Sequence, residues 1–71
     1  MRRLENLGPN IRARRQRKGV SVEVASGFIG VNAPQLRKYE RGDIIPSTKR
    51  LLYLADYYDC TLDALFEEVK Q

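Results

Sequence analysis

Only three residues, Gly30-Val31-Asn32, separate two short stretches that both carry the signals of a helix. The first stretch begins at Ser21, a residue type that caps helix N-termini, and ends at Gly30. The second is capped by Asn32, places Pro34 in its first turn, where a missing N–H does no harm, and ends before Gly42. Because the connection is so short, the two helices must cross at a steep angle.

Such a pair is a helix-turn-helix unit, and three further helices are expected around it. No strand-like alternation of apolar and polar residues competes with the helical pattern. The 71 residues allow one domain, residues 1–71, with a core over 7–66 and a short N-terminal extension over 1–6. The predicted fold class is therefore all-α, with five helices, caps included, over about 10–18, 21–30, 32–41, 47–58 and 61–69.

The charges are distributed unevenly along the chain. The net charge is +4, but residues 1–42 hold ten basic and three acidic residues, whereas residues 43–71 hold three basic and six acidic residues. One part therefore carries +7 and the other −3, which suits a protein that sets one face against a polyanion. The basic residues recur in two separate segments, and this favours nucleic acid over an ordinary solvated basic helix.

Several functional classes are not expected. Cys60 is the only cysteine and histidine is absent, so we expect neither a disulfide nor a metal site, and we interpret Cys60 as a small packing residue. No nucleophile–base pair or phosphate-binding loop is recognisable, so we expect no enzyme activity and no cofactor. No apolar run is long enough to span a membrane and the N-terminus lacks a signal-peptide pattern, which predicts a cytoplasmic protein without membrane partners.

A series of short motifs occurs in a characteristic order, namely Ile11-Arg12, Arg15, Lys18-Gly19-Val20-Ser21, Ile29-Gly30-Val31, Leu36, Tyr39-Glu40-Arg41-Gly42, Pro46-Ser47, Leu51-Leu52-Tyr53-Leu54-Ala55 and Thr61-Leu62-Asp63-Ala64-Leu65-Phe66. In these motifs the chain resembles the Cro/phage-repressor type of helix-turn-helix domain, also called the XRE family. The resemblance implies a five-helix, lambda-repressor-like DNA-binding domain that places its third helix in the major groove and binds as a twofold homodimer. It also implies an ion pair between Arg15 and Glu40 that fixes the first helix to the third.

The chain departs from the family pattern where DNA would be contacted. Val22 stands where the family has a glutamine that reaches a phosphate, although the backbone N–H groups there can still bind one. Ala33 and Pro34 stand where the family has polar side chains, and they can contact only a thymine methyl group. We assign base reading to Asn32, Ala33, Pro34, Gln35, Arg37 and Lys38, and contact with the DNA backbone to Arg12, Arg14, Arg17, Lys18, Val22, Arg41 and Ile44.

Two sets of apolar residues each allow two interpretations. Val24 and Phe28 lie four positions apart, so they share one side of the second helix. They are either extra core beneath the N-terminal segment around Leu4 or a surface for a protein partner. The apolar residues of the last helix either close the core or form the dimer contact, and they are Leu62, Leu65, Phe66 and Val69.

These features together favour a sequence-specific transcription regulator, a dimeric repressor of the type found in phages or mobile elements. Such a protein binds double-stranded DNA and is associated with the nucleoid when bound. The alternative interpretation is a protein-interaction module that keeps the helix-turn-helix fold with weakened base reading.

Overall fold

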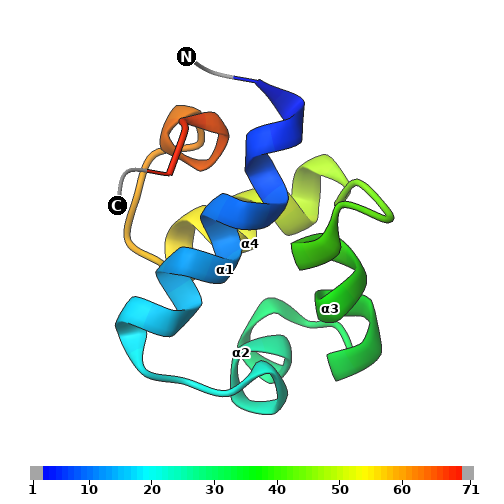
Figure 1. Ribbon diagram of the computed structural model, residues 1–71. Helices are drawn as coiled ribbons and strands as arrows, with labels where there is room; N and C mark the ends of the chain where they lie inside the picture. The colour runs from blue at the N-terminus through cyan, green and yellow to red at the C-terminus, as the bar shows by residue number, and fades with distance from the viewer. Residues whose placement is uncertain (1–2, 70–71) are drawn as a thin grey trace.

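The computed structural model describes residues 3–69, which form four α-helices and two short 3-10 helices (Figure 1). The α-helices are α1 (Leu7–Lys18), α2 (Val22–Ile29), α3 (Ala33–Arg41) and α4 (Thr48–Tyr57), and the 3-10 helices are η1 (Leu4–Asn6) and η2 (Asp63–Phe66). Residues 3–69 contain no strand, so the all-α class is confirmed. Within the same residues, no helix is long and apolar enough to cross a membrane.

Three helix starts lie where the capping residues predicted them. The side-chain oxygens of Ser21, Asn32 and Ser47 each accept a hydrogen bond from a backbone N–H three residues later. These bonds satisfy N–H groups that the first turn of a helix leaves without a partner. At the other end of α2, Gly30 adopts a φ of 83°, a left-handed conformation that favours glycine, and thereby permits the tight turn into α3.

The start of α1 was predicted too late in the chain. The helix begins at Leu7 rather than near Asn10, and η1 precedes it directly. Pro9 is compatible with this earlier start because it occupies the third helical position, where the N–H has no intrahelical acceptor. The earlier start brings Gly8 against the C-terminal end of α3, where an added Cβ would lie 2.6 Å from the carbonyl oxygen of Glu40.

The fifth α-helix over 61–69 was predicted wrongly. Thr61 does cap a short element, since its hydroxyl accepts a hydrogen bond from the Ala64 N–H at 3.1 Å. However, only the 3-10 helix η2 forms, and the backbone is extended at Glu67. The Asn10 side chain donates to the carbonyl oxygens of Ala64 and Glu67, both at 2.9 Å. Because side chains of α1 bind carbonyl groups that an α-helix would use internally, this segment is tied to α1 instead of continuing as a helix.

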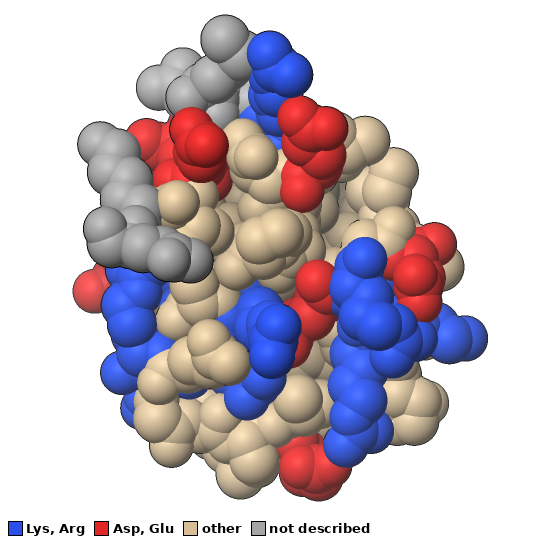
Figure 2. Space-filling view, in the orientation of Figure 1, with Lys and Arg blue, Asp and Glu red and all other residues tan. Residues whose placement is uncertain are grey.

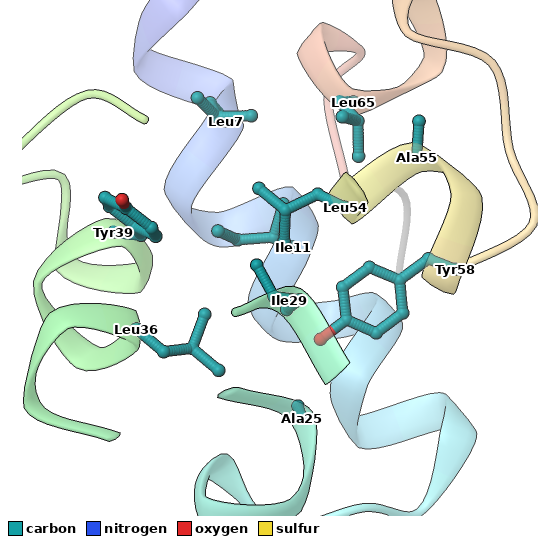
Figure 3. Packing of buried hydrophobic residues seen from close by; sticks show 10 residues of the cluster. All are labelled: Leu7, Ile11, Ala25, Ile29, Leu36, Tyr39, Leu54, Ala55, Tyr58 and Leu65. Carbon is teal, nitrogen blue, oxygen red and sulfur yellow. The ribbon is translucent and has the colours of Figure 1, made fainter. Parts of the chain in front are cut away.

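One hydrophobic core joins the four α-helices and η2 (Figure 3). Its buried members are Leu7, Ile11, Ala25, Ile29, Leu36, Tyr39, Leu54, Ala55, Tyr58 and Leu65. Leu65 is completely buried, so its side chain cannot contact a second subunit, and for this residue the interpretation that the segment closes the core is the correct one. By contrast, the side chains of Leu62, Phe66 and Val69 are partly or largely exposed.

Cys60 packs against the edge of this core and is half-buried. Burial raises the pKa of its thiol above the ordinary value, because the thiolate would lose hydration. A thiol in this state reacts slowly, as expected of a residue that serves packing.

Candidate nucleic-acid interface

Helix α3 presents one side to the core and the opposite side to solvent. Leu36 and Tyr39 are buried, whereas Pro34, Lys38 and Arg41 are exposed. Residues at positions 34, 38 and 41 repeat every three to four residues, so they form one outward stripe along the helix. Figure 2 shows a band of basic side chains over the region where Figure 1 places α3.

The predicted base-reading residues differ in whether their polar groups already have a hydrogen-bond or ion-pair partner within the protein. Asn32 uses its side-chain oxygen to cap α3, with the Gln35 N–H donating at 2.9 Å. The Gln35 amide in turn donates to the Tyr39 hydroxyl at 2.9 Å, and Arg37 pairs with Glu23 of α2 at 2.6 Å. Within residues 3–69, Lys38 has neither a hydrogen-bond nor an ion-pair partner, so its ammonium group is available to a ligand.

A shallow hollow brings cationic side chains from α1 and α3 together beside the start of α2. It is lined by Arg12, Arg15, Val22, Arg37, Glu40 and Arg41, and we call it the basic hollow. Arg15 and Glu40 neutralise each other, and Arg41 also pairs with Asp43 at 2.8 Å. The remaining positive charge lies next to the outward stripe of α3, as a site for a polyanion requires.

The ion pair at the base of this hollow is nearly buried. Arg15 Nε lies 2.7 Å from Glu40 Oε2, and a second guanidinium nitrogen donates to Oε1 at 3.1 Å. A third donates to the Val20 carbonyl oxygen, so Arg15 connects α1 to the end of α3 and to the segment before α2. The hydrogen bond to Glu40 is the main cause that raises the pKa of Arg15. This is the pairing that the family resemblance implied, and its role is to hold the helices in place.

Six of the seven residues predicted to contact the DNA backbone divide into two groups. Arg12, Val22 and Arg41 line the basic hollow, but Arg14, Arg17 and Lys18 line a different hollow together with Tyr58 and Asp59. Arg17 follows Arg12 by five positions, which places it about 140° further around α1. The structure therefore does not bring the second group to the side of the molecule that carries the basic hollow.

Arg14 and Ile44 also have surroundings that the sequence did not predict. Arg14 donates to the Asn10 side-chain oxygen at 2.7 Å, which supports the anchoring of residues 64–67 on α1. Ile44 is partly exposed and lies in an apolar groove with Leu4, Tyr39 and Ile45. Neither side chain has the exposed, charged character of a phosphate contact.

The interpretation of Val24 and Phe28 as core beneath Leu4 was wrong. Val24 is 48% exposed and Phe28 is 71% exposed. Leu4 instead lines a groove with Ile44 and Ile45 beside the beginning of α1 and is itself 55% exposed. Helical spacing placed the two residues correctly on one side of α2, but the path of the N-terminal segment depends on tertiary contacts.

One polar contact at this surface was missed from the sequence, the hydrogen bond that orients Gln35 through the hydroxyl of Tyr39. Their separation of four residues was the available signal, because such pairs are neighbours on a helix. The ring of Tyr39 packs in the core, with 3% exposure.

Several solved structures are similar to this chain in both sequence and fold. The P22 c2 repressor protein, solved in complex with a synthetic operator, is 27% identical, with a TM-score of 0.83 over 89% of this chain and 96% of that chain. The restriction–modification controller protein C.AhdI from Aeromonas hydrophila is 30% identical, with a TM-score of 0.81 over 89% and 96% of the two chains. The N-terminal DNA-binding domain of SinR from Bacillus subtilis is 26% identical, with a TM-score of 0.79 over 92% and 96%.

The resemblance to the phage-repressor type is thereby confirmed. None of the curated proteins matches the chain. A family model described as a helix-turn-helix domain matches residues 6–69, which is nearly the whole chain. The chain therefore belongs to the helix-turn-helix domain family.

Proposed function

We propose that this protein is a transcription regulator that binds double-stranded DNA with α3 in the major groove. The observation that carries the proposal is the outward stripe of α3, with the unpartnered Lys38 at its centre and the basic hollow at its side. An α-helix fits the major groove of B-DNA, and cations beside it can contact the flanking phosphates. The similar P22 c2 repressor protein was solved with a synthetic operator, which supports the same use of the fold.

The residues divide into readers of bases and contacts to phosphates. Lys38 can donate to guanine, Gln35 can pair with adenine, and Ala33 and Pro34 can contact a thymine methyl group. The Gln35 amide donates only one of its two hydrogens to the Tyr39 hydroxyl, so its second amide hydrogen and its carbonyl oxygen remain available to a base. Phosphate contact falls to Arg12 and Arg41 of the basic hollow and to the backbone at the start of α2. The pair that Arg41 forms with Asp43 is largely exposed, so it holds Arg41 only weakly.

Arg37 can also reach the duplex because its present partner holds it weakly. The Arg37 and Glu23 side chains are 46% and 65% exposed, and ion pairs at such exposure contribute little to stability. Exchange of the Glu23 carboxylate for a DNA phosphate or a guanine edge therefore costs little free energy.

Repression by a homodimer is the second part of the proposal. Two copies related by a twofold axis would place their α3 helices in half-sites about one helical turn apart, where they would block polymerase. Leu62, which is exposed, and Phe66 and Val69, which are partly exposed, are the apolar residues near the C-terminus that would meet the second copy. Such a repressor would act in the cytoplasm at the nucleoid. The alternative of a protein-interaction module with weakened base reading is less favoured, since the exposed Lys38 and the basic hollow support DNA binding.

Replacement of Lys38 by alanine is expected to weaken binding to the preferred DNA site by about 1–3 kcal/mol, because one base contact is lost. The site is first selected from random duplexes, and the affinities are then compared by gel shift. Preference at one base position should also relax.

Lys49→Ala is the matched control, because Lys49 is an exposed lysine on α4, outside the α3 stripe and the basic hollow. It should leave both affinity and sequence preference unchanged. Equal losses in the two variants would contradict the placement of α3 in the groove.

A further inference from the structure

An exposed aromatic stack lies where three helices meet near their C-terminal ends. The Phe28 ring of α2 stacks on the Tyr57 ring of α4, with centroids 5.2 Å apart and an angle of 16° between the planes. The Lys18 ammonium at the end of α1 lies 4.8 Å from the centroid of the same tyrosine ring. Together with Val24, these residues form what we call the aromatic patch.

Two members of the aromatic patch, Phe28 and Val24, take no part in the core, whereas Tyr57 is partly buried against it. The buried side of α2 is formed by Ala25, Ser26 and Ile29, whereas Phe28 is the most exposed large apolar residue of the part of the chain that the structure describes. Apart from its chain neighbours and the backbone of α2 itself, no atom lies within 4 Å of the position that a Cβ would take at Gly27, so the surface of α2 beside Phe28 is open. Exposed apolar side chains clustered in this way are characteristic of a contact surface.

The proposed DNA interface does not cover this patch either. Phe28 lies five positions after Glu23, the residue that pairs with α3, and so points about 140° away from it around α2. In Figure 1 the C-terminal end of α1 lies on the opposite side of the molecule from α3. A molecule bound to DNA through α3 would therefore present the aromatic patch to solvent.

The charges beside the patch indicate what it can bind. Lys18 has no carboxylate partner among residues 3–69, and its aliphatic stem leads into the hollow that Arg14 and Arg17 also line. Asp59 is the single acid of this hollow, against three basic residues. A ligand that fits both features has an apolar side chain for the rings and carboxylates for the cations.

We infer that the aromatic patch and the hollow lined by Arg14, Arg17 and Lys18 bind an acidic, apolar segment of a partner protein. Leucine or phenylalanine side chains of the segment would cover Phe28 and Val24. Its carboxylates would pair with Lys18 and Arg17, which the proposed DNA interface does not use. The protein would thus hold DNA and a protein partner on two separate sides.

The test uses a short synthetic peptide of Asp, Glu, Leu and Phe, titrated into the full chain and followed by NMR. Backbone resonances at Lys18, Phe28 and Tyr57 are expected to shift, while those of Lys38 stay in place. A peptide with Lys in place of Asp and Glu should cause no shifts. Phe28→Ala and Lys18→Ala are each expected to weaken binding about tenfold.

The control variant is Leu52→Ala, which removes an exposed apolar side chain of α4 outside the patch and should bind the peptide normally. All three variants change exposed residues, and thermal melting checks that they remain folded. Shifts over Lys38 and Arg41 would show that the peptide only mimics DNA and would overturn the inference. The inference would also be overturned if the patch resonances moved on addition of duplex DNA, which would identify nucleic acid as the occupant. Movement of the same resonances on concentrating the protein without peptide would identify a second copy as the occupant and would likewise overturn the inference.

Discussion

Replacement of Glu40 by alanine is expected to destabilise the fold by about 3–5 kcal/mol, the largest effect that we predict for a single substitution. The substitution leaves the Arg15 guanidinium without its carboxylate, in a place where the two side chains are only 14% and 6% exposed. A domain of this size has a total stability of several kcal/mol, so the variant should be close to unfolded at room temperature. Denaturation by urea, followed by circular dichroism, measures the change.

The control for Glu40 is the second ion pair to the α3 helix, between Glu23 and Arg37. This pair has an equally short contact of 2.6 Å but is largely exposed, so Glu23→Ala should change stability little. A double variant, Arg15→Met with Glu40→Leu, should recover much of the lost stability, because no unpaired charge remains. Similar small losses for Glu40→Ala and Glu23→Ala would contradict the structural role of the buried pair.

Replacement of Gly8 by alanine is expected to destabilise the protein by about 3 kcal/mol, at the upper end for overpacked sites. The new Cβ would lie 2.6 Å from the Glu40 carbonyl oxygen and 3.0 Å from that of Tyr39. Both are backbone atoms, which cannot rotate away, so α1 would have to move from the end of α3. The same denaturation experiment measures the loss of stability.

Gly27→Ala is the matched control, because Gly27 lies within α2 and an added Cβ there meets no atom within 4 Å. At that position alanine should stabilise the protein by about 0.5–1 kcal/mol, since glycine disfavours the interior of a helix. A Gly8→Ala variant as stable as the unaltered protein would show that the close approach of α1 to α3 is wrong.

Local chemistry was sufficient to predict most of the helices. Ser21, Asn32 and Ser47 could be recognised as caps because each acts on an N–H three residues away. The structure of residues 61–69, which were expected to form an α-helix, could not be predicted in this way. Carbonyl groups of this segment bind Asn10, more than 50 residues earlier, and the sequence gives no local sign of such a contact.

The candidate site was predictable only in part, for a related reason. The assignment of Lys38 to base reading fits its outward position opposite the buried Leu36 and Tyr39, because which side of α3 a residue occupies follows from the period of one helix. Which basic residues of α1 lie beside α3 depends on how the two helices pack. The sequence therefore could not separate Arg12 from Arg17, and the Arg15–Glu40 pair came from the family resemblance rather than from spacing.

Salt dependence of DNA binding tests the central claim most directly. Affinity for a selected duplex site is measured over a range of salt concentrations for the unaltered protein and for Arg12→Ala, Arg41→Ala and Arg17→Ala. If the basic hollow meets the phosphates, Arg12→Ala and Arg41→Ala each reduce the slope of log K against log salt by about 0.9, whereas Arg17→Ala leaves it unchanged. A flat salt dependence of the unaltered protein, or a reduction confined to Arg17→Ala, would contradict the account.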